Sequence, residues 1–187
     1  RSPKFTPCSY ATMSNARPPF EENTYYHVYN RGFEQGRIFY VQDDYKRFCK
    51  KIFHYEEQYI SKLEIDTWSI LPNHFHFLVR IRHFEDYQLL GDSPHTLVAD
   101  RMKRLFRTYA LAFNRNHGRT GSLFDGPFKR VHVGDNKYLS YLVQYIHVNP
   151  EKNQLIHDFK LWDWSSYKFI LSPRKSLVDR DFVLEWF

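Results

Sequence analysis

The sequence has few cysteines and no long apolar run. Its 187 residues include 2 cysteines, Cys8 and Cys49, which are far apart and lack the spacing of zinc ligands. This excludes a disulfide scaffold and a zinc ribbon and fits a reducing cytoplasm. No apolar stretch approaches the roughly 20 residues of a membrane span, and none resembles a signal peptide. We therefore expect a cytoplasmic protein that does not contact a membrane.

Aromatic and basic residues, in contrast, are abundant. Aromatic side chains make up 19% of the chain, and the net charge is +6. A basic, aromatic surface is typical of proteins that bind phosphates and stack on bases, although a basic globular protein without a polyanionic partner shares this composition. The length suits one domain, expected at residues 23–150. A polar, proline-rich arm at residues 1–22 is expected to be disordered, and residues 151–187 form a tail packed on the domain.

The spacing of apolar residues predicts the order strand, helix, strand, strand, helix, strand, helix. The strands are expected at residues 24–30, 63–70, 74–79 and 129–133, and the helices at 42–59, 96–116 and 136–148, with a short final helix at 179–187. Asn149 and Pro150 are expected to end the third helix. This order predicts an α+β, ferredoxin-like split β-α-β fold with a central antiparallel sheet, helices on one face and an extra C-terminal tail.

Two histidines, His74 and His76, stand one residue apart in an apolar strand. Because side chains alternate along a strand, both share a face with Leu78, while Phe75 and Phe77 point to the other face. Histidines in apolar strands are more often packing or surface residues. Two imidazoles on a rigid strand nevertheless form half of a metal site, which a second element would have to complete.

The helix at residues 136–148 offers such an element. Tyr141, Tyr145 and Asn149 follow each other at intervals of four residues and therefore form one stripe. Each tyrosine taken alone is better explained as a half-buried packing residue. Opposite the two histidines, however, a tyrosine with an amide one turn later supplies an oxygen nucleophile and a neutral oxygen ligand. A divalent cation, Mg or Mn in the cell, would help such a phenol attack a phosphodiester and form a phosphotyrosine.

Five segments resemble those of a known family. They are Tyr26-His27-Val28-Tyr29-Asn30-Arg31-Gly32, Leu71-Pro72-Asn73-His74-Phe75-His76, Gly118-Arg119-Thr120-Gly121-Ser122-Leu123-Phe124, Tyr145-Ile146-His147-Val148-Asn149-Pro150 and Trp164-Ser165-Ser166-Tyr167. In this order, over about residues 23–167, the sequence resembles the REP-associated tyrosine transposases, a branch of the single-tyrosine HUH transposases. The residues after Pro150 depart from the family pattern.

The resemblance implies a metal-dependent endonuclease and transposase that cuts and rejoins single-stranded DNA beside hairpins of repetitive extragenic palindromes. His74 and His76 would be metal ligands, Tyr145 the nucleophile that forms a 5′-phosphotyrosine, and Asn149 a third ligand, where related groups use Gln. The cofactor would be Mg or Mn, and the partner single-stranded or hairpin DNA in the bacterial nucleoid. We expect a monomer, with a dimer that exchanges the tyrosine helix as the alternative.

Basic residues within these segments and between them are candidates for DNA binding. They are Arg31, Arg101, Lys103, Arg104, Arg107, Arg119, Lys129 and Arg130. Contacts from Lys and Arg to phosphate give salt-dependent affinity without sequence information. A charged helix face is usually just solvated, but in the helix at residues 96–116 only Asp100 offsets five basic residues.

Two other functions remain open at this stage. A catalytically silent module could bind hairpin DNA with this fold, without needing a metal. A metal phosphodiesterase could use water as its nucleophile and would leave no covalent adduct. If the protein is a tyrosine transposase, Tyr141 and Tyr138 are the alternatives to Tyr145 as the nucleophile.

Overall fold

Four antiparallel strands form the centre of the molecule. The computed structural model describes residues 17–59, 63–83, 93–172 and 180–184. The strands are β1 (Thr24–Arg31), β2 (Leu63–Leu71), β3 (His74–Ile81) and β4 (Lys129–Val133), and their order in the sheet is β2-β3-β1-β4. Each neighbouring pair is antiparallel. This is the ferredoxin-like arrangement, so the predicted fold class is confirmed.

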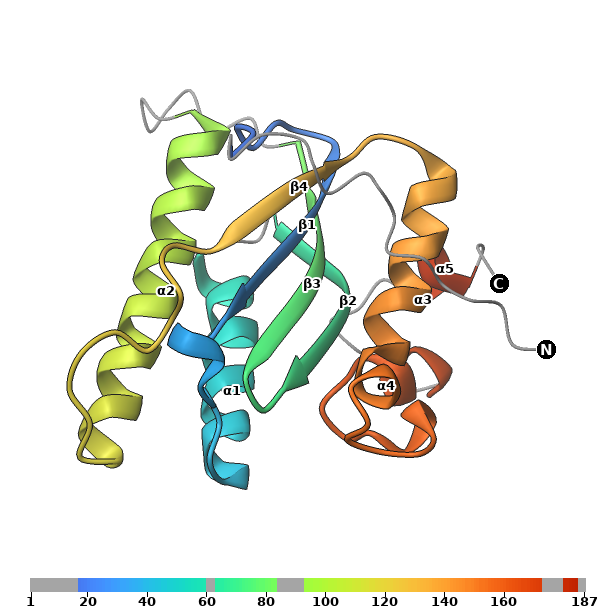
Figure 1. Ribbon diagram of the computed structural model, residues 1–187. Coiled ribbons are helices and arrows are strands. Elements are labelled where there is room, and N and C mark those ends of the chain that lie inside the picture. Colours follow the sequence, from blue (N-terminus) through green and yellow to red (C-terminus); the bar gives the residue numbers. More distant parts are fainter. Residues whose placement is uncertain (1–16, 60–62, 84–92, 173–179, 185–187) are drawn as a thin grey trace.

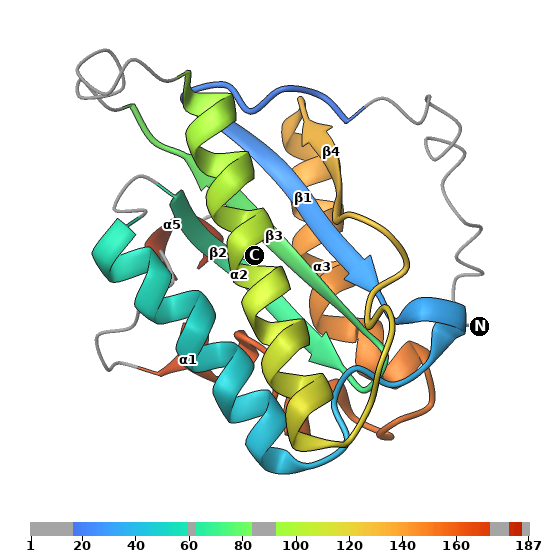
Figure 2. The same cartoon turned by 90° about the vertical axis from the view of Figure 1, so that its left-hand side faces the viewer.

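Two helices, α1 (Gln42–Tyr59) and α2 (Pro94–Asn116), lie side by side on one face of the sheet (Figures 1 and 2). Phe75 of β3 packs against Phe48 of α1 and Phe106 of α2, with ring centroids 5.2 and 5.1 Å apart. Each fully buried Phe contributes roughly 1.5–3 kcal/mol of transfer free energy. This aromatic core fixes β3 and therefore the direction in which its histidines point.

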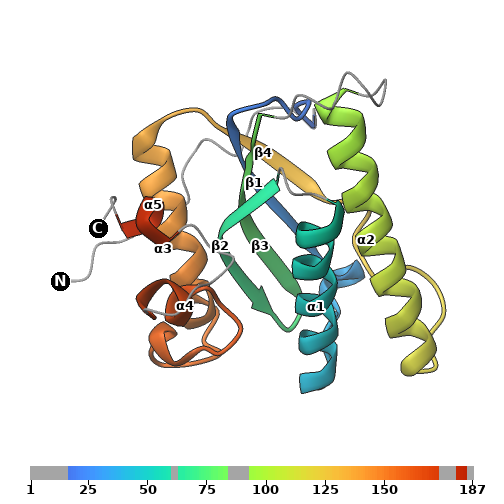
Figure 3. The same ribbon diagram turned by 180° about the vertical axis from the view of Figure 1, so that it is seen from behind.

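The third long helix, α3 (Asn136–Lys152), covers the opposite face of the sheet (Figures 1 and 3). Its first turn is capped by Asp135, whose carboxylate accepts a hydrogen bond from the Tyr138 amide at 2.7 Å. Leu142, Val143 and Ile146 are almost fully buried beneath it. Because these residues fix the rotation of α3, they also determine which of its side chains reach the sheet.

Helix α3 is longer than the sequence predicts. We expected it to end at residue 148, since a proline disfavours helical geometry at the residue before it, but Pro150 lies inside the helix. Pro150 lacks a backbone N–H, but it lies close to the C-terminal end of the helix. The backbone N–H of Asn153 closes the last turn by donating to the Asn149 carbonyl at 3.0 Å. The extra turn keeps Asn149 helical and buried, which matters for the site described below.

The C-terminal tail packs along the edge strand β2. It contains η4 (Phe159–Leu161), α4 (Tyr167–Leu171) and α5 (Arg180–Leu184). The amide of Ile70 donates to the carbonyl of Trp164 at 2.8 Å, and the amide of Ser166 donates to the carbonyl of Trp68 at 2.9 Å. The tail thus covers polar backbone groups that an edge strand would otherwise expose. Helix α5 falls within the helix expected at residues 179–187, whose ends lie outside the described residues.

Residues before β1 also contribute to the core. Residues 1–16, most of the expected arm, lie outside the described part of the chain, but Phe20 near its end is only 2% exposed. Its ring contacts Tyr26 at 4.9 Å and stacks on Phe128 at 6.5 Å. The described end of this segment, residues 17–22, is therefore held on the domain by apolar packing.

One short element lies at the end of β1, close to the turn between β2 and β3. The 3-10 helix η2 (Phe33–Gln35) follows β1 directly. Gly32 at the junction has no room for a side chain, because a Cβ there would lie 1.9 Å from the carbonyl oxygen of Gly36. The amide of Gly32 donates to the carbonyl of Asn73 at 2.8 Å. This contact ties the end of β1 to the turn just before the histidines.

Candidate active site

Strand pairing places both histidines of β3 on the face opposite the aromatic core. His76 lies opposite Tyr29 of β1, and His74 lies opposite Arg31. Directly paired residues of antiparallel strands share a face, so these four side chains belong to one surface, which we call the histidine face. Phe75 points to α1 and α2 and is fully buried. The predicted division of β3 into two faces is therefore confirmed.

A third histidine, His27 of β1, joins the pair, although its place in the first strand predicts no such role. Its Nε2 lies 2.8 Å from Nδ1 of His76 in a buried hydrogen bond. Burial lowers the pKa of His27 to about 3. Burial, with the neighbouring His27 and His74, holds the pKa of His76 well below its usual range. Both imidazoles are therefore neutral near pH 7, which is the state that can bind a metal.

His74 bridges two asparagine side chains. Its Nδ1 donates to Oδ1 of Asn73 at 2.6 Å, and its Nε2 lies 3.0 Å from Oδ1 of Asn149. Burial lowers the pKa of His74, although the contact with Asn149 acts in the opposite direction. A neutral imidazole has only one N–H to donate. With that proton on Nδ1, the lone pair of Nε2 faces an oxygen that is also an acceptor.

Neighbouring hydrogen bonds fix the orientation of both amides. Nδ2 of Asn153 donates to Oδ1 and to the backbone carbonyl of Asn149, both at 2.8 Å. Nδ2 of Asn73 points away from His74, toward the carbonyl of Gln35 at 3.4 Å. Turning the Asn149 amide over would set two NH2 groups 2.8 Å apart, and turning the Asn73 amide over would exchange its contact with Gln35 for one between two oxygens. The facing lone pairs of His74 and Asn149 are thus a consequence of the network.

Two facing acceptors are the arrangement that a shared cation requires. Ligands about 2.1 Å from a cation and at right angles to each other are about 3 Å apart, which matches the 3.0 Å between His74 and Asn149. His76 lies beside them, its ring 5.2 Å from that of His74. Among the described residues, no three His, Cys, Asp or Glu side chains form a group that could hold a metal ion. The donor set therefore fits a divalent cation only when the Asn149 amide oxygen is included.

Tyr145 of α3 faces this cluster. Its ring meets those of His76 and His27 edge-on, with centroids 5.5 and 6.4 Å apart. Burial raises its pKa, and a hydrogen bond to Asn149 acts in the opposite direction. The ammonium group of Lys152 lies 5.3 Å from the ring centroid. The structure thus brings together the four site residues expected from the sequence, His74, His76, Tyr145 and Asn149.

The other two tyrosines of α3 continue a column away from Tyr145. Tyr141 stacks on Tyr145 at 6.1 Å, and Tyr138 stacks on Tyr141 at 6.4 Å. Each lies about one helical turn earlier than the next. Tyr141 is therefore the tyrosine of α3 whose ring lies next to that of Tyr145.

Two of the expected DNA-binding residues lie on the histidine face. Arg31 pairs in register with His74, and its Nε donates to Oδ2 of Asp125 at 2.7 Å. Lys129 pairs in register with Tyr29 and is exposed. Lys152, which we did not predict, adds a third cation next to Tyr145. The last turn of a helix favours Lys, so this position could have been noted from the sequence only after the true end of α3 was known.

Arg130 has a different role from the one expected. It is 8% exposed, and its guanidinium donates to the carbonyls of Pro18 and Arg17. The same group lies 4.6 Å from the ring centroid of Phe20. Because it follows Lys129 by one residue, it points to the other face of β4. Arg130 fastens residues 17–20 to the domain with its Nε and one terminal nitrogen, which donate to these two carbonyls.

The remaining expected DNA-binding residues belong to α2 and its C-terminal end, and Figure 2 shows α2 on the other face of the sheet from α3, the helix that contains Tyr145. Lys103, Arg104 and Arg107 are exposed, and Lys103 pairs with Asp100 at 2.9 Å. Arg101 is partly exposed, and Arg119 lies over the ring of Phe113 at 5.7 Å. The structure therefore separates these residues from the histidine face.

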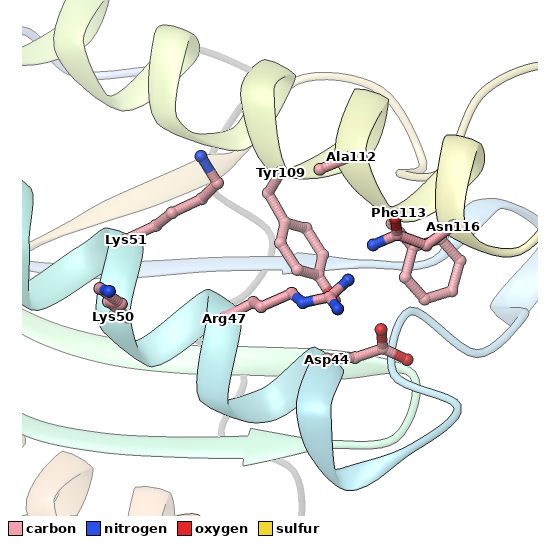
Figure 4. A pocket seen from close by; sticks show the side chains of 8 residues that line it. All are labelled: Asp44, Arg47, Lys50, Lys51, Tyr109, Ala112, Phe113 and Asn116. Carbon is pink, nitrogen blue, oxygen red and sulfur yellow. The ribbon is translucent and has the colours of Figure 1, made fainter.

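A cavity of about 310 Å³ lies between α1 and α2, as Figure 4 shows. Its lining residues are Asp44, Arg47, Lys50, Lys51, Tyr109, Ala112, Phe113 and Asn116. Asp44 is already paired with His117, whose Nε2 lies 2.9 Å from its carboxylate. None of the residues of the histidine face lines this cavity, so it is separate from the candidate active site.

No model of a known protein family matches the sequence, and no curated protein is similar enough to match. No helix in the described ranges has the length and apolar character needed to cross a membrane.

One solved structure is similar over nearly the whole chain. It is a REP-associated tyrosine transposase bound to a REP hairpin, with 16% identity, a TM-score of 0.63, and coverage of 89% of this chain and 94% of that one. A bacterial tRNA(His) guanylyltransferase-like protein in complex with GTP has 11% identity, coverage of 79% and 75%, and a TM-score of 0.44. A candidate transposase from Deinococcus radiodurans has 16% identity, coverage of 76% and 98%, and a TM-score of 0.34. The last two likenesses are too weak to support an argument. The similarity to the first of these structures shows that the chain has the fold of a REP-associated tyrosine transposase.

Proposed function

We propose that this protein is a metal-dependent endonuclease and transposase that cuts and rejoins single-stranded DNA next to hairpins of the REP type, through a 5′-phosphotyrosine on Tyr145. The observation that carries the proposal is the convergence of Tyr145 and Asn149 from α3 with His74 and His76 from β3. A nucleophile, two neutral imidazoles and an oriented amide oxygen lie at one place on the sheet. A hairpin-binding module without catalysis has no need of this set.

His74, His76 and Asn149 would hold the cation, which is Mg or Mn in our proposal. When bound, such a cation polarises the scissile phosphate and neutralises charge that develops during the attack. Asn73 and Asn153 support the site from outside by orienting the His74 ring and the Asn149 amide. Ligands held in this way need little rearrangement, which is the general role of such outer contacts.

Tyr145 would supply the nucleophilic oxygen. Its Oη forms a bond to phosphorus, the bond from phosphorus to the 3′ oxygen breaks, and the phenolic proton ends on the released 3′ hydroxyl. Since burial raises its pKa, the phenol is protonated near pH 7 and loses its proton only as the attack proceeds. The phosphodiester energy is kept in the phosphotyrosine, so rejoining needs no nucleotide cofactor.

The DNA would lie across the histidine face. Arg31 and Lys129 line it, and Lys152 stands beside Tyr145. Such cations hold phosphates without reading the sequence. Support for a hairpin as the partner comes from the neighbour with the same fold, which was solved with a REP hairpin.

A covalent adduct tests the proposal directly. Single-stranded DNA carrying a REP-type hairpin and a labelled 3′ flank is incubated with the protein and Mn²⁺, then run on a denaturing gel. We expect a labelled adduct with the wild type, none with Tyr145→Phe, and an unchanged adduct with the matched control Tyr141→Phe. Loss of the adduct in Tyr141→Phe and its persistence in Tyr145→Phe would identify Tyr141 as the nucleophile instead. Cleavage without any adduct would instead indicate a phosphodiesterase that uses water, and hairpin binding without cleavage would indicate a silent module.

A further inference from the structure

His27 is the one member of the histidine cluster to which the proposed mechanism assigns no role. It is 8% exposed and comes from a different strand than His74 and His76. Its Nε2 lies 2.8 Å from Nδ1 of His76, and the two rings are 5.1 Å apart. Tyr29 stacks on His27 at 4.8 Å and on His76 at 5.8 Å. The ring of His27 is therefore fixed against the ring that would bind the cation.

The direction of this hydrogen bond determines what His76 can bind. A neutral imidazole carries one proton, on either Nδ1 or Nε2. When His76 donates from Nδ1, its Nε2 is an unprotonated lone pair. When His27 donates, Nδ1 of His76 accepts, and its only proton is on Nε2, where it blocks coordination. One hydrogen bond thus separates a ligand from a group that cannot act as one.

His74 shows which of the two arrangements the site uses. Its Nδ1 faces the side-chain oxygen of Asn73 at 2.6 Å, and an oxygen can only accept. The proton of His74 is therefore on Nδ1, and its Nε2 faces Asn149. In both histidines of β3, Nδ1 is hydrogen-bonded to a neighbouring side chain, which is Asn73 for His74 and His27 for His76. A cation shared by the two rings requires the same tautomer in both.

We propose that His27 is a positioning residue, which accepts a hydrogen bond from Nδ1–H of His76 and thereby leaves Nε2 of His76 unprotonated for the cation. This inference rests on the proposed function, because the role of the tautomer is to prepare a metal ligand. His27 does not touch the cation in this scheme and acts through His76. Groups that orient metal-bound histidines in this way typically change metal affinity by about 10- to 100-fold when they are removed.

The tautomer is measured in the metal-free protein, so no catalytic activity is needed. Two-bond ¹⁵N–¹H correlation spectra of protein labelled at histidine distinguish Nδ1–H from Nε2–H, and His76→Gln assigns the His76 signals by their loss. We expect the wild type to have the proton of His76 on Nδ1. In His27→Phe, which keeps a ring but has no acceptor, we expect the proton to move to Nε2. A wild-type spectrum with Nε2–H at His76 would overturn the inference.

Metal binding is then measured by calorimetry with Mn²⁺. We expect His27→Phe to bind about 10- to 100-fold more weakly, and His27→Gln, whose side-chain oxygen can accept the same proton, to stay within about threefold of the wild type. The control is His132→Phe, because His132 is exposed and lies on the opposite face of the sheet. Binding by His27→Phe as tight as that of the wild type would contradict the inference.

The two readouts separate this inference from the proposed function. A wild type that has the expected tautomer but does not bind Mn²⁺ would refute the metal site and leave the role of His27 in setting the tautomer intact. A wild type that binds Mn²⁺ with His76 in the other tautomer before binding would refute the role of His27 and leave the metal site standing. Circular dichroism of each variant checks that the fold is retained.

Discussion

Nε2 of His74 and Oδ1 of Asn149 face each other at 3.0 Å although 75 positions separate them in the chain. Each of the two residues is oriented by another asparagine, Asn73 for the imidazole and Asn153 for the amide. Two acceptors held this close are unfavourable unless something positive lies between them. The pair joins β3, which carries the histidines, to α3, which carries Tyr145. Because a cation between the two acceptors would stabilise them, changes at this pair should alter metal binding directly.

Asn149 offers a matched pair of substitutions. Asn149→Asp keeps an oxygen toward His74 and adds a negative charge, so we expect Mn²⁺ affinity equal to or greater than that of the wild type. Asn149→Leu fills similar space without an oxygen ligand, and we expect a loss of about tenfold or more, as is typical when support for a metal site is removed. Calorimetric titration with Mn²⁺ measures both. Equal affinities for the two variants would exclude Asn149 as a ligand.

Lys129 and Arg130 are neighbours on β4 and point to opposite faces of the sheet. Lys129→Ala should weaken hairpin binding and reduce the slope of log affinity against log salt by about 0.7–0.9, the contribution of one phosphate contact. Its melting temperature should not change, because Lys129 is exposed. Binding isotherms at several salt concentrations give the slope.

Arg130→Ala should instead destabilise the fold. It removes hydrogen bonds to the Pro18 and Arg17 carbonyls and the contact with Phe20. Hydrogen bonds from a charged donor contribute about 1.5–3 kcal/mol, so we expect a loss of about 2 kcal/mol in urea unfolding. If Arg130→Ala had an unchanged free energy of unfolding and a lower slope of log affinity against log salt, Arg130 would be a DNA-binding residue instead.

The basic residues of α2 test how far the DNA extends. Arg104 and Arg107 are exposed on α2, which lies across the sheet from α3. A hairpin bound on the histidine face alone does not reach them, so Arg104→Gln/Arg107→Gln should change hairpin affinity less than Lys129→Ala does. A decrease of the salt slope by nearly two in the double variant would show that the DNA wraps around to α2.

His147 predicts a pH-dependent stability that is separate from the active site. Its Nε2 lies 2.8 Å from Oγ of Ser166, and burial lowers its pKa to about 4. The unfolded chain takes up this proton near pH 6.5, whereas the folded protein resists protonation down to about pH 4. The stabilisation is therefore complete above about pH 6.5 and is lost as the pH falls toward 4, at up to about 1.4 kcal/mol per pH unit.

Urea unfolding between pH 4.5 and 7 checks this prediction. The difference between the wild type and His147→Gln should vary with pH, because the glutamine does not titrate. His132→Gln is the control, since His132 is exposed on β4. Parallel curves for the wild type and His147→Gln would show that His147 is not the group responsible.

Much of the site follows from periodicity. Alternation along β3 was enough to predict that His74 and His76 share a face, and a spacing of four on α3 was enough to align Tyr145 with Asn149. The same alternation separates Lys129 from Arg130, although we grouped both as DNA-binding residues by their charge. Charge alone does not specify a face, and only the packing of Phe20 against Arg130 explains why that arginine is buried.

Local sequence determined the elements of this protein, their order and the face on which each chemical group lies, because a residue's neighbours along the chain set hydrophobic period and turn preference. Which groups from different elements meet was decided by the tertiary structure. The role of His27 depends on the register of β1 against β3, and the buried position of Asn149 depends on a helix that continues through Pro150. Both result from contacts across tens of residues, in which packing and hydrogen bonding outweigh the local preferences that a sequence reveals.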